Sequence, residues 1–159
     1  MKQVLNDDSV NLFSRPPLVA TLDVYREETG VGSAYRFCLI VCHFKSMFGG
    51  KVEETEPRRL EQARFVASLV DEILEHEPDA KVVVLGDLNS TRTSKPIVAL
   101  TNGTTLGSQL RMLNCKMKIN DQYSYVYKGK AQYLDYILVN DNAFDLAKKE
   151  LRDLKVRRI

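Results

Sequence analysis

The sequence predicts a single domain of the mixed α/β class, and three features indicate it. An unbroken apolar run, residues 82–85 (VVVL), follows Lys81 and suits a strand that is buried on both faces. A stripe of apolar residues at helical spacing follows Pro57 and predicts an amphipathic helix. Two apolar stretches, residues 18–25 and 35–44, are joined by a loop with two glycines and predict a pair of antiparallel strands. At 159 residues, 44% of them hydrophobic, the chain is long enough for one domain with a sizeable core.

The composition excludes several classes of protein. The net charge is +2, from 23 basic and 21 acidic residues, so any recognition of phosphate must be local. Cys38 and Cys42 fall on one predicted strand, about 13 Å apart, which is too far for a disulfide between them. The N-terminal sequence lacks the basic region and apolar run of a secretory signal, and no stretch of about 18 apolar residues could span a membrane. We therefore expect a soluble chain without a disulfide framework.

The first elements follow from local sequence signals. Pro16 and Pro17 forbid a helix and lead as an extended arm into the strand predicted over residues 18–25. The partner strand over residues 35–44 ends at a polar cluster that begins with His43. Because His43 alternates with the apolar residues of one strand face, it is expected at the end of that face.

A helix is predicted to start near Pro57, a residue that suits the first turn. Glu53, Glu54 and Glu56 precede it, and they either favour the helix dipole or act as metal ligands; the dipole explanation needs no ligand. His76 lies late in the same helix, where an imidazole favours the negative helix end without any further function. The apolar stripe consists of Leu60, Ala63, Ala67, Val70, Ile73 and Leu74.

The remainder of the chain is predicted to form short helices and strands joined by loops. Leucines at 106, 110 and 113 suggest a short helix within the weakly patterned stretch 101–122. The basic tail, residues 148–159, could contact phosphates, but it is predicted as the solvated face of a helix. The other predicted elements are a polar loop over 91–94, a short helix over 95–100, strands over 123–127 and 133–139, and a turn at KGKAQ between these strands.

Asp87 and Asn89 follow the central strand directly and form the first candidate site. Gly86 lets the backbone turn, and ligands in helix-covered sheets tend to bind beyond the carboxyl ends of strands. A carboxylate with a carboxamide can bind a metal ion, a water or a phosphate oxygen. Asp and Asn are also common turn and N-cap residues, so the pair taken alone favours a structural turn over a functional site.

Asp135 lies within the last predicted strand, between apolar neighbours, and is expected to be largely buried. A buried carboxylate needs a partner, because leaving it unpaired costs several kcal/mol. The partner is either structural, such as a tyrosine or backbone amides, or catalytic, such as a histidine whose tautomer the carboxylate fixes.

Five stretches in order resemble one family: SRPPLVATL, HFKS with His43, GDLNS with Asp87 and Asn89, YSYVYKGKAQ, and LDYILV with Asp135. Together they are similar to the metal-dependent endonuclease/exonuclease/phosphatase superfamily, which includes deoxyribonucleases, and above all to predicted bacterial nucleases in it. The resemblance implies a two-sheet α/β sandwich with outer helices. It also implies metal-dependent hydrolysis of phosphodiester or phosphomonoester bonds, most of all as a nuclease, with Mg²⁺ or Mn²⁺ as cofactor and a phosphate ester such as DNA or RNA as substrate.

The resemblance also implies roles for four residues. Asp87 would orient or deprotonate the attacking water, and Asn89 would bind a phosphate oxygen. Asp87 and Asn89 are also the implied metal ligands. His43 would donate a hydrogen bond to the phosphate or the leaving group, and Asp135 would orient a second histidine. Bacterial relatives of this type include exported proteins.

The sequence departs from the family at both ends. The sequence does not contain three features of the family: the first strand with its Asn, the metal-binding Glu on a helix, and the terminal Ser-Asp-His. Residues 1–159 are therefore expected to form a partial domain. We expect the chain alone to hydrolyse phosphodiesters poorly, and to expose sheet edges that favour association. The alternatives are a phosphate- or nucleic-acid-binding module without catalysis, and a purely structural domain.

Overall fold

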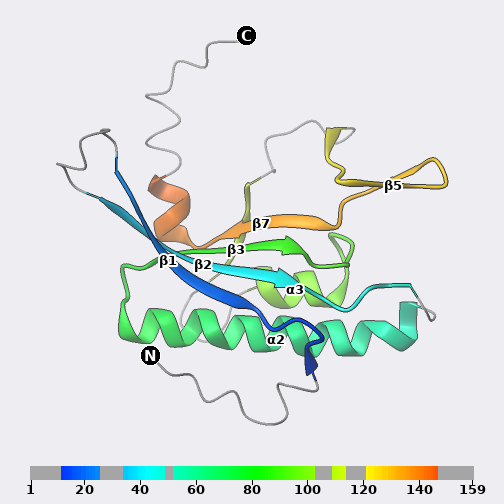
Figure 1. The fold of residues 1–159 in the computed structure, drawn as a ribbon, viewed down its shortest axis with the longest axis horizontal. Helices are drawn as coiled ribbons and strands as arrows, with labels where there is room; N and C mark the ends of the chain where they lie inside the picture. The colour runs from blue at the N-terminus through cyan, green and yellow to red at the C-terminus, as the bar shows by residue number, and fades with distance from the viewer. Residues whose placement is uncertain (1–11, 26–33, 49–51, 103–108, 114–120, 147–159) are drawn as a thin grey trace.

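The computed structural model describes residues 12–25, 34–48, 52–102, 109–113 and 121–146. Within them, five strands form one sheet in the order β1-β2-β3-β7-β4, and β5 and β6 form a second, two-stranded sheet. The predicted mixed α/β class with two sheets and helices is thereby confirmed (Figure 1). The strands are β1 (Leu18–Val24), β2 (Tyr35–His43), β3 (Lys81–Asp87), β4 (Arg111–Met112), β5 (Tyr125–Tyr127), β6 (Lys130–Gln132) and β7 (Asp135–Val139); the helices are α2 (Val52–His76) and α3 (Lys95–Thr101).

Strand pairing brings the polar carboxyl ends of β2 and β3 to the same edge of the sheet. β1 and β2 are antiparallel, as the sequence predicts, and β2 and β3 are parallel because α2 forms the crossover between them. Both parallel strands therefore end at the same edge of the sheet. β7 returns antiparallel to β3, so its first residue lies at that same edge.

Helices α2 and α3 lie on the same side of the large sheet (Figure 1). Alternate residues of β2, β3 and β7 point toward them and form the core, where fully burying each large aliphatic side chain contributes about 1.5–3 kcal/mol. The predicted stripe of α2 packs there, and its Ala63 and Val70 are fully buried. Core residues from the sheet include Ile40, Cys42, Val82, Val84, Tyr136 and Leu138; those from the helices include Val66, Leu69 and Ile97.

The opposite face of the large sheet is open among the described residues. Leu18, Leu22 and Val41 on β1 and β2, and Ile137 on β7, are all at least 36% exposed on this face. Strand β1 forms one edge of the sheet. This open face explains why several side chains that alternate with the core are exposed.

Helix α2 begins at Val52, five residues before the predicted start. Pro57 therefore lies inside the helix, where it removes one backbone hydrogen bond near the N-terminal end. Glu53 and Glu54 occupy the first turn, where their charges favour the helix dipole. His76 ends the helix and donates from Nδ1 to the carbonyl of Glu72 at 2.8 Å, so one of its ring nitrogens is bonded within the helix itself.

Two other expectations are corrected by the structure. The segment KGKAQ is more than a turn: Lys128 and Gly129, with φ of 48° and 75°, form the turn itself, and Lys130–Gln132 is a strand paired with Tyr125–Tyr127. Residues Arg111–Met112 form β4 beside β7 instead of the short helix suggested by the leucines. Strand pairing decided this segment, which local periodicity could not. The predicted helix over the basic tail lies outside the described residues.

Asn140 joins the beginning of β3 to the end of β7. This side chain is buried, donates from Nδ2 to the carbonyl of Ala80 at 2.8 Å, and accepts from the amides of Val82 at 3.0 Å and Ala143 at 3.2 Å. The bonds to Oδ1 satisfy two backbone amides, and the Ala80 carbonyl accepts a second hydrogen bond from Asn142 Nδ2 at 3.1 Å.

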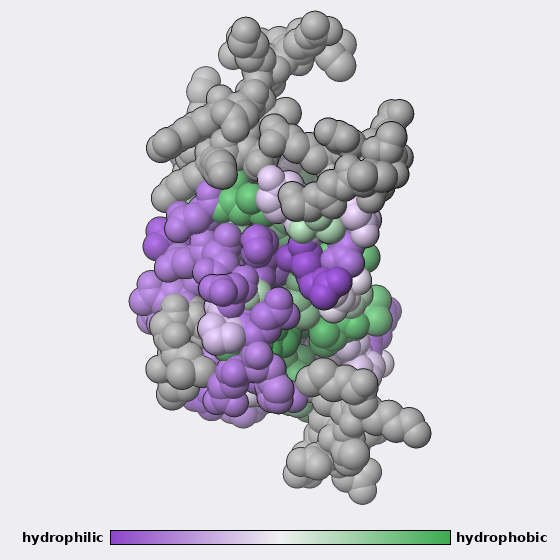
Figure 2. All heavy atoms as spheres, turned by 90° about the vertical axis from the view of Figure 1, so that its left-hand side faces the viewer, coloured by the Kyte–Doolittle hydropathy of each residue, from purple (hydrophilic) through white to green (hydrophobic). Residues whose placement is uncertain are grey.

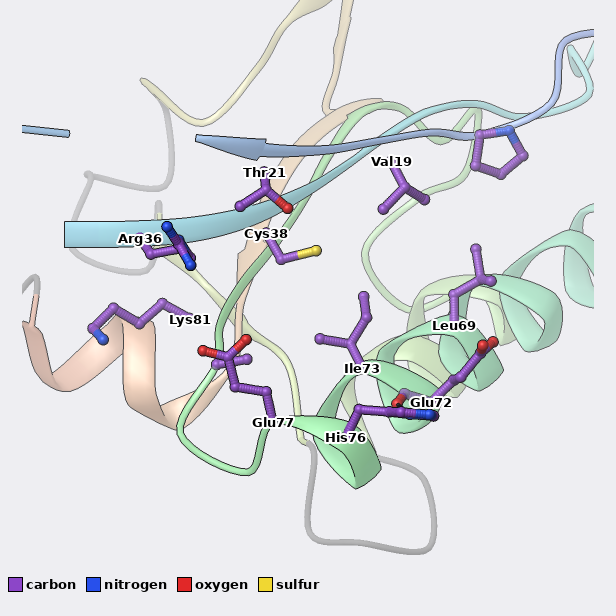
Figure 3. Close-up of a pocket in the computed structure, with 12 residues that line it drawn as sticks. Val19, Thr21, Arg36, Cys38, Leu69, Glu72, Ile73, His76, Glu77 and Lys81 are labelled. Atoms are coloured by element: carbon purple, nitrogen blue, oxygen red, sulfur yellow. Dashed lines mark hydrogen bonds between the residues drawn. The ribbon is translucent and has the colours of Figure 1, made fainter. Parts of the chain in front are cut away.

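A groove with a volume of about 530 Å³ lies between β1, β2 and the last turns of α2 (Figure 3). Val19, Leu69 and Ile73 form its apolar wall, and Arg36 and Glu77 lie at its rim. Figure 2 views the molecule from the end away from the carboxyl ends of β2 and β3, where hydrophilic residues dominate and hydrophobic ones show toward one side. Within the part of the chain that the structure describes, no helix is long and apolar enough to cross a membrane.

Candidate active site

Three polar residues lie in one row across the large sheet. In the strand register His43 is opposite Asp87, and Asp87 is opposite Asp135. Side chains of directly paired residues project from the same face, here the open face. His43 Nε2 is 3.9 Å from Asp87 Oδ2. The sheet therefore brings together three of the four residues that the sequence indicated, although they come from three separate strands.

Gly86 allows β2 and β3 to approach closely next to this row. Its φ is 126°, and a Cβ atom at this position would lie 2.1 Å from the carbonyl oxygen of Cys42. Real Cβ contacts are essentially never below 3.0 Å. Only glycine fits here, both for its backbone conformation and for its contact with the neighbouring strand.

Asp87 has an environment that favours its protonated form. Burial raises the pKa of the carboxyl above its ordinary value, and the nearby charge of Asp135 raises it further. The backbone amide of Asn89, which donates to Asp87 Oδ1 at 2.8 Å, and His43 both act in the opposite direction. One carboxylate oxygen is thus held by the backbone, while the other faces His43.

Asn89 has a structural role that is visible directly. It adopts φ of 46°, a left-handed conformation that asparagine tolerates well. The side chain is buried, and its Nδ2 donates to the carbonyl of Phe44 at 3.2 Å. This bond ties the loop after β2 to the loop after β3. The implied role of Asn89 in binding metal or phosphate stays a prediction.

Asp135 is exposed, and the expectation of a largely buried carboxylate is wrong. The reason is its face: Asp135 alternates with the buried Tyr136 and projects with Ile137 from the open side of the sheet. The sequence shows apolar neighbours on both faces but does not show that one face lacks a covering layer. Its carboxylate lies beside Asp87 instead of in the core.

Arg15 contacts His43 and was not singled out from the sequence. An Arg15 guanidinium nitrogen lies against His43 Nδ1. A guanidinium only donates hydrogen bonds, so His43 Nδ1 must be the acceptor, and a proton on the ring is then carried by Nε2, which faces Asp87. The sequence did contain a signal for Arg15, because this residue belongs to the family-like SRPPL stretch. Its contact with a residue 28 positions away, however, depends on the fold.

The arm that carries Arg15 is held against α2. The carbonyl of Leu12 accepts hydrogen bonds from Arg58 Nε at 3.0 Å and from Gln62 Nε2 at 2.9 Å. Gln62 Oε1 also accepts from the amide of Lys45 at 2.8 Å. One buried glutamine therefore positions both the arm before β1 and the loop after His43.

The residues present fit a divalent cation in part. Oxygen donors suit Mg²⁺ or Mn²⁺, and the adjacent carboxylates of Asp87 and Asp135 repel each other, a repulsion that a bound cation would relieve. Among the described residues, no group of three or more His, Cys, Asp or Glu side chains is arranged to hold a metal ion. The described residues thus offer one side of a coordination shell, and Glu53 and Glu54 in α2 do not extend it.

Comparison with known proteins establishes the family. The model of the endonuclease/exonuclease/phosphatase family matches residues 4–158. This match spans almost the whole sequence, and the chain belongs to this family, which lies within a superfamily of metal-dependent phosphoester hydrolases. None of the curated proteins matches the sequence.

Two similar solved structures support the same fold. The catalytic domain of human Nocturnin with bound sulfate anion has a TM-score of 0.53 and 19% identity, covering 79% of this chain and 42% of that one. A truncated Caenorhabditis elegans TDP2 has a TM-score of 0.50 and 16% identity, covering 78% of this chain and 53% of that one. At these identities the likeness concerns the fold alone. The present chain spans about half of the length of these proteins or less.

Proposed function

We propose that this chain carries a phosphoester-hydrolysing centre of the nuclease type, acting on phosphodiester or phosphomonoester bonds with Mg²⁺ or Mn²⁺. The observation that carries the proposal is the row of His43, Asp87 and Asp135 at the ends of β2, β3 and β7. Membership of the family supports the reaction class. The sulfate bound to the similar Nocturnin domain is consistent with a fold that accepts tetrahedral oxyanions.

Asp87 is the group that takes the proton from the attacking water. Without a bound cation, burial and the charge of Asp135 raise its pKa, which makes the carboxylate a stronger base than an ordinary aspartate; a cation bound to it would lower the pKa again. The amide of Asn89 holds Oδ1, so that Oδ2 stays free to accept the proton. A divalent ion held by Asp87, with Asn89 and Asp135 as further oxygen donors, would neutralise charge on the phosphoryl oxygens when bound.

His43 donates from Nε2 to a phosphoryl oxygen or to the leaving group. The distance of 3.9 Å between His43 Nε2 and Asp87 Oδ2 is too long for a direct hydrogen bond, so a phosphoryl oxygen that lies to one side of the pair can accept from Nε2. Arg15 lies on the other side of the ring and adds a permanent positive charge next to the place where the phosphate would bind.

Turnover by the chain alone is expected to be slow. Asp87 and Asp135 are the two carboxylates of the row, and Mg²⁺ gives up its waters reluctantly, so two carboxylates give low occupancy. Each loss of about 1.4 kcal/mol in transition-state stabilisation slows the reaction tenfold. The second candidate function, binding of phosphate or nucleic acid without catalysis, is favoured by the same sparse set of carboxylates among the described residues.

The test is hydrolysis of bis-p-nitrophenyl phosphate by the whole chain, with millimolar Mg²⁺ or Mn²⁺ and with EDTA. Slow, metal-dependent turnover that Asp87→Ala abolishes is the expected result. Asp23→Ala is the matched control, because Asp23 belongs to the same sheet but pairs with Arg36 at 2.7 Å, away from the row. Turnover that persists in EDTA or in Asp87→Ala contradicts the proposal. Oxyanion binding without turnover supports the second function.

A further inference from the structure

The β5–β6 hairpin presents two tyrosine rings on one face. Tyr125 and Tyr127 are two residues apart on β5 and therefore project to the same side. Their rings are nearly parallel, at an interplanar angle of 10° and a centroid distance of 6.4 Å. Both residues are exposed, at 38% and 39%. Lys130 is the cross-strand partner of Tyr127 and shares this face.

A third ring comes from a different part of the chain. Phe48, in the loop after β2, packs edge-to-face on Tyr127 at 5.4 Å and is 59% exposed. Lys128 places its Nζ 5.3 Å from the centroid of the Tyr127 ring. Between residues 123 and 133 the sequence contains two lysines and no acidic residue. We call Phe48, Tyr125, Tyr127, Lys128 and Lys130 the aromatic platform.

The aromatic platform is connected to the candidate active site on both sides. Ser124, next to β5, accepts hydrogen bonds through Oγ from the amides of Leu134 at 3.1 Å and Asp135 at 3.0 Å. Phe48 belongs to the loop that begins immediately after His43. The hairpin extends beyond the end of the sheet at which β2 and β3 finish (Figure 1). A chain lying on the platform would thus continue toward the row of polar residues.

Exposed aromatic rings flanked by cations suit single-stranded nucleic acid. Unpaired bases can stack on tyrosine and phenylalanine, and lysines meet the phosphates that link them. In a duplex the base faces are already stacked and only their edges are accessible, so a platform of ring faces discriminates against it. We propose that the aromatic platform binds a single-stranded polynucleotide and directs one of its phosphodiesters to His43 and Asp87. This inference rests on the proposed function and names its class of substrate.

The experiment measures fluorescence anisotropy of a labelled oligothymidylate of about ten nucleotides with the whole chain, in EDTA to prevent turnover. An oligouridylate of the same length compares DNA with RNA. An abasic deoxyribose-phosphate strand of equal length has the same charge but no bases, and a duplex has bases that are already stacked. We expect the two single strands with bases to bind more tightly than the abasic strand or the duplex.

The variants separate stacking from other effects. Tyr127→Ala should weaken binding of the oligothymidylate by roughly 5- to 150-fold, whereas Tyr127→Phe, which keeps the ring, should bind as the wild type does. Phe48→Ala should also weaken binding. Phe48 lies outside the β5–β6 hairpin, so a loss in this variant cannot be explained by a disturbed hairpin. Tyr25→Ala is the matched control, because Tyr25 is an exposed tyrosine at the end of β1 outside the platform.

The outcomes distinguish this inference from the proposed function. Equal affinity for the oligothymidylate and the abasic strand, or equal loss in Tyr127→Ala and Tyr25→Ala, overturns the platform even when bis-p-nitrophenyl phosphate is hydrolysed. Base-dependent binding that Tyr127→Ala removes supports the platform even when the wild-type chain shows no hydrolysis, and in that case the hydrolase proposal fails instead. Tighter binding of the duplex than of the single strand also overturns it.

Discussion

Replacing Gly86 by alanine is expected to destabilise the fold strongly, because the substitution has two separate costs. A φ of 126° lies in a region that only glycine occupies freely, and a side chain there costs about 1–3 kcal/mol. The new Cβ would also lie 2.1 Å from the Cys42 carbonyl oxygen, so β2 and β3 must separate by about 0.9 Å to reach a 3.0 Å contact. Such overpacking costs about 1–3 kcal/mol. The expected loss is roughly 2–6 kcal/mol, a large share of typical domain stability.

Gly129→Ala provides a matched control for this prediction. Gly129 also has a positive φ, of 75°, but a Cβ atom there would meet nothing within 4 Å. The control therefore carries the conformational cost without the clash, about 1–2 kcal/mol. Urea unfolding followed by circular dichroism gives the free energy of unfolding of both variants, and the excess loss in Gly86→Ala measures the clash together with the higher backbone cost at φ of 126°.

Two results would refute this reasoning. If Gly86→Ala and Gly129→Ala lose the same stability, β2 tolerates the new Cβ atom and the close strand approach is not a constraint. If Gly86→Ala unfolds at the wild-type urea concentration, neither cost exists. Because Gly86 precedes Asp87, separation of the strands should also move Asp87 away from His43 and reduce turnover beyond the loss of folded protein.

Three further outcomes follow from the site and its support. Because the pKa of Asp87 is raised in the folded state, protonation of this carboxyl stabilises the fold; the stabilisation is complete below the unfolded pKa and is lost as the pH rises through the folded pKa. Over that pH interval the wild type should lose stability relative to Asp87→Asn in urea unfolding. Parallel pH profiles of the two proteins would contradict this. Asp135→Asn removes one cause of the shift and should lower the pKa of Asp87, as an NMR titration of the carboxyl carbon would show; an unchanged or higher value would count against the pairing. Asn140→Ala leaves the amides of Val82 and Ala143 without their side-chain acceptor, while the Ala80 carbonyl keeps its bond from Asn142 Nδ2, and should cost roughly 2–5 kcal/mol in thermal unfolding, so a loss under about 1 kcal/mol would disagree with the network.

The sequence by itself determined the local elements and their class. The apolar run before Gly86 predicted a strand, and β3 forms there, but the expectation of burial on both faces is wrong: Val82 and Val84 are buried against the helices, whereas Val83 and Leu85 on the open face are only partly buried. The stripe of α2 required a partner surface for its apolar face. The two apolar stretches on either side of a glycine-containing sequence predicted the antiparallel pair that β1 and β2 form. His43 and Asp87 were located at strand ends because polar residues directly follow apolar runs there. These signals are periodicities and local backbone preferences, which a short window of sequence contains.

Only the tertiary structure decided which of these residues meet. Asp135 lies opposite Asp87 because β7 pairs with β3 in one particular register, and a shift by one residue would have turned its carboxylate into the core. Arg15 reaches His43 because Gln62 and Arg58 hold the arm that carries it. The exposure of Asp135 likewise depends on the absence of a covering layer over one sheet face among the described residues. Register and layering arise from contacts between distant segments, and for that physical reason no local pattern contains them.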